Sequence, residues 1–426
     1  MKILYISYFF PPLGGPAALR NVKTVSYLSE MGTKISVLTV QDIVYAYSDP
    51  GLLDLCKGVE IHRVASLDPM ALLRRILGKK SSASQVVYKR SPERLKLFVR
   101  RLAPIDDKIG WLPQLLKSGR KLLSSQDFDL VYVSCGPFSS ALAAYKLADE
   151  FDKPLVVDYR DYWTLLSDYD LMGSLLKRAY SRAWEERIIK RASLLICATK
   201  GIRDDLAKAF DPSLHERSFL LYNGHDERDF LDVPPASPSR DFFTLSYFGN
   251  IYARRSLKSL YQGILELERE ELIPTNLRIL LYGNFNREVY DEIAQSGIGE
   301  RVKVMPQLSH VQALTKMQEA DALILVINSS SPRGTLTSKV FEYLRSGRPI
   351  LAMVPRLGEA AALLSECGIS TMCPMESVSA IKDCLSTLFD TRFLAPGVSP
   401  RLHKYERGKQ LATLHKQLGS LVDSTK

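Results

Sequence analysis

The chain has 426 residues, of which 46% are hydrophobic and 24% are charged, and its formal net charge at pH 7 is +10. This composition excludes a disordered or fibrous protein, and the length predicts two domains rather than one. No apolar run reaches the roughly 18–20 residues of a membrane-spanning helix, and residues 1–10 lack the cleavage site of a secretory signal, so we expect a cytoplasmic protein.

The first half of the chain alternates short apolar strands with amphipathic helices. Strands separated by helices of this length predict a parallel sheet that is covered on both faces. The stretch "LDVPPASPSRD" (231–241) contains three prolines and ends the pattern, so we expect a linker there. The predicted strands are 2–9, 34–40, 129–135, 154–161, 193–199 and 218–224, and the predicted helices are 16–32 and 138–151.

The same pattern restarts after the linker and predicts a second parallel α/β domain. In open parallel sheets, ligands bind outside the carboxyl ends of the strands, so functional residues should follow strands and face a cleft between the domains. The predicted strands are 242–249, 277–283, 302–306, 322–327 and 348–354, and the predicted helices are 256–268 and 403–422.

Positive charge is concentrated in residues 74–101, which hold ten Lys or Arg residues and one acid, Glu93. That segment alone carries +9, ten minus one, so the rest of the chain is close to neutral. Apolar residues are interleaved with the basic ones, a pattern that suits an anionic lipid surface. A solvated helical face is the alternative, and nucleic acid is disfavoured because no recognition module is visible.

The six cysteines and six histidines form no recognisable zinc-binding motif. The cysteines are scattered, with no C-x-x-C pair. We therefore expect buried free thiols and no metal.

Two strand ends of the first domain carry candidate functional residues. Gly14 and Gly15 precede a helix, so they either offer backbone N–H groups to a phosphate or form only a tight turn. In "VVDYRDYW", Asp158, Arg160 and Asp161 crowd the end of a strand, where charges are costly to bury unless they are paired. Either a structural Asp–Arg pair orients this loop, or Asp161 handles an acceptor hydroxyl.

In the second domain, basic residues follow the first strand. The stretch "YFGNIYARRSLKSL" contains Gly249, which permits a sharp turn, and then Arg254, Arg255 and Lys258. Cations at this place suit a diphosphate, whose charge arginine meets with parallel hydrogen bonds. A solvated basic face is the alternative, and the placement after a strand favours the anion site.

The stretch "TSKVFEYLRSGRPILAM" (337–353) predicts a short helix that ends at Gly347, followed by a buried strand. We expect Thr337 or Ser338 to cap this helix. The residues expected to pack inward are Val340, Phe341 and Leu344.

Lys339 and Glu342 share another face of the same helix. They form either a local ion pair on a surface helix or part of a ligand site. In the second case the helix start suits a phosphate, and Glu342 accepts two hydrogen bonds from a ribose diol.

Several stretches together resemble the family 4 glycosyltransferases. The resemblance implies the GT-B fold, with two Rossmann-like domains: an acceptor-binding one (1–232) and a nucleotide-sugar-binding one (240–400). It also implies that a helix in 401–426 packs back toward the first domain. The stretches are "ISYFFPPLGGPAALR", "DDKIGWLPQLLKSGRKLL" (106–123), "VVDYRD", "LLYNGHD" (220–226), "FGNIYARRS" and "KVFEYLRSGRPILA".

The resemblance implies roles around the helix that starts near residue 338. Glu342 matches the second Glu of the family's E-x7-E motif, which holds the donor ribose, whereas the first Glu is replaced by Gly334. Loop N–H groups of Gly334, Thr335 and Leu336 would then contact the donor sugar and phosphates, next to Lys339.

Further positions of this chain match donor-binding positions of the family. Arg255 lies where the family places a phosphate-binding Lys, and Asn250 stands where an Arg is usual, so Arg254 or Lys258 would compensate. The glycine turn at Gly15 would also contact the donor.

Two further matches concern the nucleobase and the reacting centre. Gln307 and Leu308 match the segment whose backbone meets the base, and Asp161 matches a residue near the reacting centre.

The resemblance implies transfer of a sugar, with retention, from a nucleotide-sugar donor (UDP or GDP) to a lipid-linked or other glycan acceptor in the synthesis of bacterial surface polysaccharide. It implies no cofactor. Residues 74–101 would dock on the inner face of the membrane. The alternatives are a sugar-nucleotide 2-epimerase of the same fold and a non-catalytic membrane-associated protein.

Overall fold

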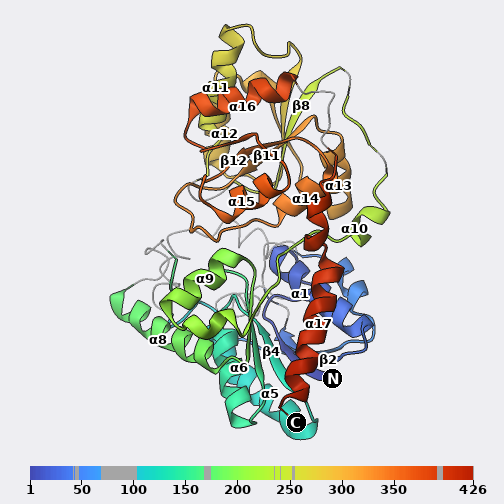
Figure 1. Cartoon of the computed structure of the whole chain (residues 1–426), viewed down its shortest axis with the longest axis vertical. Helices are drawn as coiled ribbons and strands as arrows, with labels where there is room; N and C mark the ends of the chain where they lie inside the picture. Colours follow the sequence, from blue (N-terminus) through green and yellow to red (C-terminus); the bar gives the residue numbers. More distant parts are fainter. Residues whose placement is uncertain are drawn as a thin grey trace. The chain divides into compact units, whose positions relative to one another are not determined.

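The computed structural model describes residues 1–41, 43, 48–68, 103–166, 174–234, 236–239, 241–251, 255–390 and 397–425. The basic segment 74–101 and Arg254 lie outside these ranges. Two compact units form, Met1–Tyr222 together with Gly408–Lys426, and Asn223–Arg407 (Figure 1).

The first unit is built on a seven-stranded parallel sheet in the order β3-β2-β1-β4-β5-β6-β7. The sequence pattern predicts six of these strands. It misses the edge strand β3, since "EIHRV" is only partly buried and contains no continuous apolar run. The strands are β1 (Lys2–Ile6), β2 (Lys34–Val40), β3 (Glu60–Val64), β4 (Leu130–Ser134), β5 (Leu155–Tyr159), β6 (Leu194–Cys197) and β7 (Ser218–Leu220).

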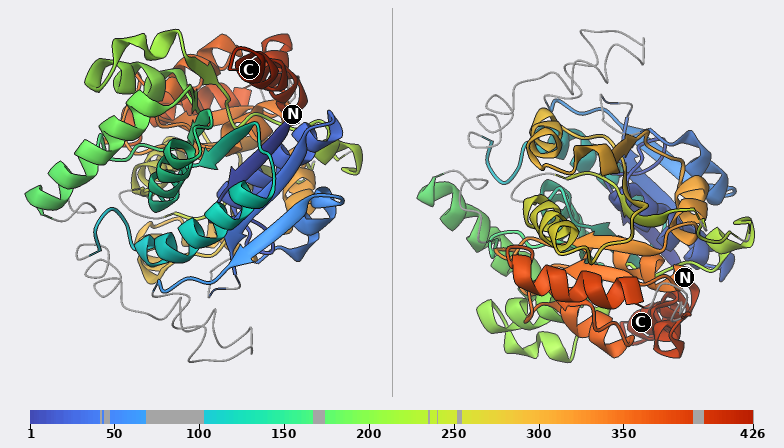
Figure 2. Two further views of the ribbon diagram at one scale, coloured as in Figure 1. Left: turned by 90° about the horizontal axis from the view of Figure 1, so that it is seen from below. Right: turned by 90° about the horizontal axis from the view of Figure 1, so that it is seen from above.

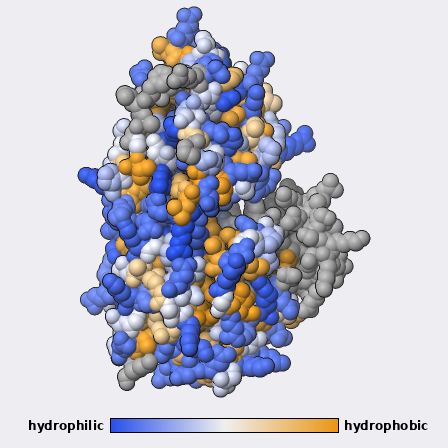
Figure 3. Space-filling view, turned by 90° about the vertical axis from the view of Figure 1, so that its right-hand side faces the viewer, coloured by the Kyte–Doolittle hydropathy of each residue, from blue (hydrophilic) through white to orange (hydrophobic). Residues whose placement is uncertain are grey.

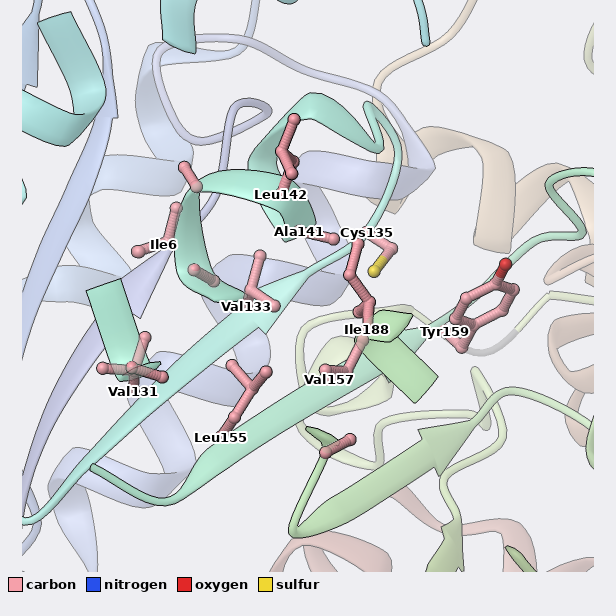
Figure 4. Packing of buried hydrophobic residues seen from close by; sticks show 14 of the residues in the cluster. Ile6, Val131, Val133, Cys135, Ala141, Leu142, Leu155, Val157, Tyr159 and Ile188 are labelled. Carbon is pink, nitrogen blue, oxygen red and sulfur yellow. The ribbon is translucent and has the colours of Figure 1, made fainter. Parts of the chain in front are cut away.

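Helices cover both faces of this sheet. On one face, Ala141 and Ile188 of two helices pack on Val131 and Val157 of the strands (Figure 4). The helices of this face are α5 (Leu112–Ser125), α6 (Ser139–Glu150), α8 (Leu175–Arg191) and α9 (Lys200–Ala209).

The other face of the first sheet is covered by α1 (Pro16–Glu30) and by α17 (Arg407–Asp423) at the far end of the chain. Leu414 of α17 and Val25 of α1 share a core with Tyr5. The C-terminal helix lies beside the N-terminal strands in both directions of view (Figures 1 and 2).

The second unit holds a six-stranded parallel sheet in the order β10-β9-β8-β11-β12-β13. The sequence pattern predicts five strands and misses β13, which has two residues. The strands are β8 (Phe243–Phe248), β9 (Leu277–Tyr282), β10 (Val302–Met305), β11 (Ala322–Val326), β12 (Ile350–Met353) and β13 (Met372–Cys373). The predicted fold class, two doubly wound parallel-sheet domains, is confirmed.

Right-handed crossovers place the helices of the second unit on opposite faces of its sheet, because the chain winds outward from β8 in one direction and from β11 in the other. The helices on one side are α11 (Lys258–Arg269), α12 (Arg287–Gln295) and α16 (Val378–Asp390). The remaining helices are α10 (Arg228–Leu231), α13 (His310–Gln318), α14 (Lys339–Ser346) and α15 (Glu359–Glu366). Short 3₁₀ turns span Pro50–Cys56, Ile109–Trp111, Pro212–His215, Gly299–Arg301 and Pro400–Tyr405.

The surface carries few large apolar side chains. On the face drawn in Figure 3, hydrophobic residues are interspersed with hydrophilic ones, as is normal for a globular protein. Within the described ranges, no helix is both long and apolar enough to cross a membrane. The cysteines are free thiols, and all but Cys384 are buried, as predicted.

A buried ion pair joins α1 to the centre of the first sheet. Arg20 donates from Nε and Nη2 to the two Asp158 oxygens at 3.0 and 2.7 Å, and from Nη1 to the Leu221 carbonyl at 2.9 Å. The two side chains are 3% and 0% exposed. An Asp–Arg pair is expected at the end of strand 154–161, and Arg160 does pair with Asp161, at 3.7 Å. The buried Asp158, however, pairs with Arg20, which the sequence pattern does not indicate. Arg160 also donates to the carbonyls of Cys135 and Gly136, beyond the end of the strand.

Replacing Arg20 with Met should destabilise the first unit by about 3–5 kcal/mol, because it leaves Asp158 as an unpaired buried charge. All three tryptophans lie in this unit, at 111, 163 and 184. Urea denaturation followed by tryptophan fluorescence therefore measures the unfolding of this unit. The double variant Arg20→Met/Asp158→Asn should recover more than half of the lost free energy of unfolding. If the double variant instead loses as much stability as the two single variants together, Arg20 and Asp158 do not stabilise the unit as a pair.

Candidate functional site

The winding of the second sheet reverses between β8 and β11, which are neighbouring parallel strands. Chain segments leave the carboxyl ends of these two strands toward opposite faces, so a ligand can reach the strand ends between them. Gly249 follows β8, and the loop 328–338 leads from β11 into α14.

Buried residues hold α14 against this point of the sheet. Val340, Phe341 and Leu344 are buried, as the sequence predicts. The Phe248 N–H, at the end of β8, donates to the Tyr343 hydroxyl at 3.2 Å. Gly347 ends the helix with φ +69°, a conformation that glycine adopts without strain.

The prediction of a side-chain cap on α14 is wrong. Ser338 is the N-cap residue, but its side chain accepts no capping hydrogen bond. Its backbone is already helical, and tight turns satisfy the first N–H groups: Val340 donates to the Thr337 carbonyl at 3.3 Å and Phe341 to the Ser338 carbonyl at 3.2 Å. The start of the helix is thus set by backbone turns rather than by a hydroxyl.

Lys339 extends from α14 to the end of β8. Its Nζ lies 3.2 Å from the Tyr247 hydroxyl and 4.5 Å from the centre of the Tyr247 ring. A Cβ on Gly249 would lie 2.6 Å from this Nζ, so only glycine leaves room for the ammonium group. Burial and the nearby Arg255 lower the pKa of Lys339 to about 7, and Glu342 opposes this shift.

Glu342, one turn further along α14, is the other unusual charge. Burial raises the pKa of its carboxyl group, although His310 acts in the opposite direction. The nearest basic group is the imidazole of His310, whose Nδ1 is 4.0 Å away, and no described residue donates a hydrogen bond to this carboxylate. The alternative of a Lys339–Glu342 ion pair is also wrong, since no such pair forms within 4.0 Å between these two described residues. Lys339 is directed toward Tyr247 instead.

His310 connects Glu342 to α10. Its Nε2 lies 3.3 Å from Asp229 Oδ2. The start of α13, and with it His310, is fixed by a capping box in which Ser309 and Gln312 exchange hydrogen bonds. Arg345 clamps α10 to α14 by donating to both Glu227 oxygens at 2.7 Å.

Polar side chains connect the ends of the next strands. Asn250 Oδ1 accepts from the Asn284 N–H at 3.1 Å, and the Asn284 side chain donates to Gln307. The loops after β8, β9 and β10 are therefore held together. Leu308 follows Gln307 and is half-buried.

The remaining residues predicted for this site lie on the flanking loops. Arg255 is half-buried and close enough to influence Lys339, whereas Lys258 is exposed at the first position of α11. Gly334 is buried, and Thr335 closes a turn by donating its N–H to the Pro332 carbonyl at 2.9 Å. Leu336 is half-buried in the same loop.

The predicted residues of the first unit lie at the carboxyl ends of its own strands. Gly15 is the N-cap of α1 with φ +92°, so it forms the tight turn. The Asp161 side chain is 74% exposed and lies 3.7 Å from Arg160 Nε.

The sequence pattern misses four residues that the structure adds to the site. They are remote in sequence and carry no motif that could have indicated them, although Tyr247 lies inside the predicted strand 242–249. The four residues are Asp229, Tyr247, Asn284 and His310.

Comparisons with known proteins agree with this fold. Residues 56–229 match the family model described as Glycosyltransferase Family 4. A comparison with curated proteins gives no match.

Solved structures of low sequence identity share the GT-B fold of two parallel-sheet domains, and at these identities the likeness concerns the fold alone. Sucrose-phosphate synthase from Thermosynechococcus elongatus has a TM-score of 0.66 at 12% identity, with 100% of both chains covered. HepE from Anabaena, in complex with UDP and glucose, has a TM-score of 0.63 at 15% identity, again with 100% of both chains covered. A Listeria monocytogenes protein assigned as a UDP-N-acetylglucosamine 2-epimerase has a TM-score of 0.58 at 12% identity, over 100% of this chain and 97% of that one.

Because the half-buried Glu342 carboxylate accepts no hydrogen bond from a described residue, Glu342→Gln should stabilise the second unit at pH 8. We expect the apparent Tm of this unit to rise by about 2–4 °C, which corresponds to about 1 kcal/mol in a unit of this size. The pKa of Glu342 is raised in the folded state, so its ionisation destabilises the fold. This destabilisation is complete above the folded pKa and disappears as the pH falls through the folded pKa toward the unfolded pKa.

Scanning calorimetry at pH 8 and at pH 4.5 measures this difference. The exposed Glu300, replaced with Gln, is the matched control and should leave Tm unchanged. A lower Tm for Glu342→Gln at pH 8 would show that the carboxylate has a structural partner.

Proposed function

We propose that the chain is a family 4 glycosyltransferase, the family whose model its residues 56–229 match, and that it transfers a sugar from a nucleoside diphosphate sugar to a hydroxyl group of a glycan. The second unit would bind the donor, and the first would bind the acceptor. Transfer would proceed with retention at the anomeric carbon.

One observation supports this proposal most strongly. At the switch point of the second sheet, the Lys339 ammonium and Arg255 lie on one side, and Glu342 presents a carboxylate without a hydrogen-bond donor. Two cations suit a diphosphate, and a carboxylate that lacks partners suits the two hydroxyls of a ribose. Half-buried charges without a counter-ion are costly to a protein unless a ligand uses them.

In the proposed reaction, the acceptor oxygen forms a bond to the anomeric carbon, while the bond from that carbon to the diphosphate oxygen breaks. Negative charge develops on the leaving nucleoside diphosphate, and Arg255, Lys258 and Lys339 would stabilise it electrostatically. The proton of the acceptor hydroxyl passes to the departing diphosphate. We assign the positioning of this hydroxyl to Asp161, whose exposed carboxylate is accessible to a ligand.

The donor nucleotide is proposed to be UDP or GDP. The loops after β8, β9 and β10, which Asn250, Asn284 and Gln307 hold together, would form the ledge for the base, together with Leu308. HepE, which shares the fold, binds UDP, and this favours UDP. The turn Gly334–Leu336 and the glycine turn at Gly15 are the proposed contacts of the donor sugar and phosphates.

Binding of uridine, guanosine and adenosine diphosphates, measured by isothermal titration calorimetry, tests the proposal. One of the three should bind, and Glu342→Gln should weaken that binding about 10- to 100-fold, because hydrogen bonds to a charged group contribute about 1.5–3 kcal/mol each. Glu300→Gln is the control. If none of the three nucleotides binds, the donor site is refuted.

Two other functions make different predictions in the same experiments. A sugar-nucleotide 2-epimerase would convert its donor without an acceptor, and the carboxylates on either side of His310 are the observation that favours it. A non-catalytic protein would neither transfer nor hydrolyse the donor sugar. Product analysis with and without acceptor glycans therefore separates the three functions.

The acceptor is proposed to be a lipid-linked glycan of a surface polysaccharide, reached by peripheral binding of residues 74–101 to an anionic membrane. Each basic residue near such a surface contributes about 1 kcal/mol, so Lys79→Gln/Lys80→Gln should weaken vesicle binding about 30-fold. Co-sedimentation with phosphatidylglycerol vesicles measures this effect. The exposed pair Arg287 and Lys303 of the second unit, replaced in the same way, is the control. Equal losses in both double variants would refute a specific role for 74–101.

A further inference from the structure

We propose that Lys339 brings from α14 to the end of β8 a cation for the donor diphosphate, beside Arg255, and that it takes up a proton when the diphosphate binds. This inference rests on the proposed function. It names one residue of the donor site and gives it a measurable thermodynamic signature. It also makes donor affinity depend on pH in the neutral range.

The described residues directly after β8, Gly249, Asn250 and Ile251, carry no cation, and the Asn250 side chain is engaged with the Asn284 N–H. Arg255, later in the same loop, is close enough to influence Lys339. A second charge for the diphosphate, at the strand end itself, comes from another element. Lys339 extends across from α14, and the absence of a side chain at Gly249 admits its ammonium group to the strand end.

The contacts of Lys339 hold its Nζ in place without neutralising a charge. The Tyr247 hydroxyl donates to the Asn250 carbonyl at 2.9 Å, so its oxygen is left to accept from Nζ at 3.2 Å. Because the lysine donates only one N–H to this hydroxyl, either the ammonium or the neutral amine can make the contact. The Tyr247 ring face, 4.5 Å from Nζ, adds a weak attraction for a cation.

The groups around Lys339 favour the neutral amine in the absence of a ligand. Tyr247 faces the amine from β8, and Arg255 faces it from the segment before α11. Glu342 lies on the same helix as Lys339, and its carboxylate also lies 4.0 Å from Nδ1 of His310 in α13. Burial and Arg255 outweigh Glu342, and the pKa of Lys339 falls to about 7. A diphosphate beside Nζ would reverse this balance and raise the pKa again.

The linkage has a definite sign. Above pH 7 the free protein carries mostly neutral Lys339 and the complex carries charged Lys339, so binding takes up a proton and the affinity falls as the pH rises. With a pKa that rises by about two units on binding, the affinity should weaken about tenfold between pH 7 and pH 8.5.

Calorimetric titration with UDP at pH 8, in Tris and in HEPES, measures proton uptake from the difference in apparent enthalpy. At this pH UDP is fully ionised, so a proton taken up enters the protein. The wild type should take up close to one proton. GDP replaces UDP as the probe if the protein binds only GDP.

Two substitutions identify the group that takes up the proton. Lys339→Arg should bind UDP without proton uptake, because arginine is already charged, and Lys339→Met should bind at least tenfold more weakly and also without uptake. The exposed Lys303, replaced with Met, is the control and should leave uptake unchanged.

The outcomes separate this inference from the function on which it rests. Binding of UDP or GDP with no proton uptake, or with uptake that persists in Lys339→Arg, would overturn the inference and leave the donor site intact. Absence of binding by any nucleotide would overturn both.

Discussion

Both units are built from parallel strands, and in each sheet the winding reverses between two neighbouring strands. This constraint determines where side chains at the strand ends are accessible to a ligand. All carboxyl ends of a parallel sheet lie along one edge, but crossover connections cover most of them. Only where successive connections leave toward opposite faces does the edge stay accessible. In the second unit this is the gap between β8 and β11. Residues 90 positions apart, Gly249 and Lys339, therefore meet there.

The two units use buried charge in opposite ways. In the first, Arg20 and Asp158 satisfy each other almost completely, and the Leu221 carbonyl takes a further N–H of the guanidinium. A pair of this kind fixes one packing of helix on sheet and has nothing left to offer a ligand. In the second, Lys339 and Glu342 are half-buried and do not pair with each other, and their pKa values shift toward the neutral forms. The proposed donor site rests on these two charges, which no described residue of opposite charge neutralises within 4.0 Å other than His310, if it is protonated.

The site of the second unit also depends on elements that contribute no ligand contact. Arg345 clamps the short helix α10 through Glu227, and this contact brings Asp229 to His310 and therefore to Glu342. Since α10 spans only four residues, it has too few backbone hydrogen bonds to be stable alone. The clamp explains why residues from Asn223 onward belong to the second compact unit although the sequence changes character only at 231–241.

The sequence by itself determined the fold class, eleven of the thirteen strands, and the burial of Val340, Phe341 and Leu344 in α14. The reason is that the period of apolar residues directly reflects which faces are buried. It missed β3 and β13, which lie at sheet edges and bury little. Only the tertiary structure decided that Arg20 pairs with Asp158 and that Lys339 turns away from Glu342 toward Tyr247. These choices depend on which strands become neighbours, and local periodicity contains no information about contacts between residues that are distant in the chain.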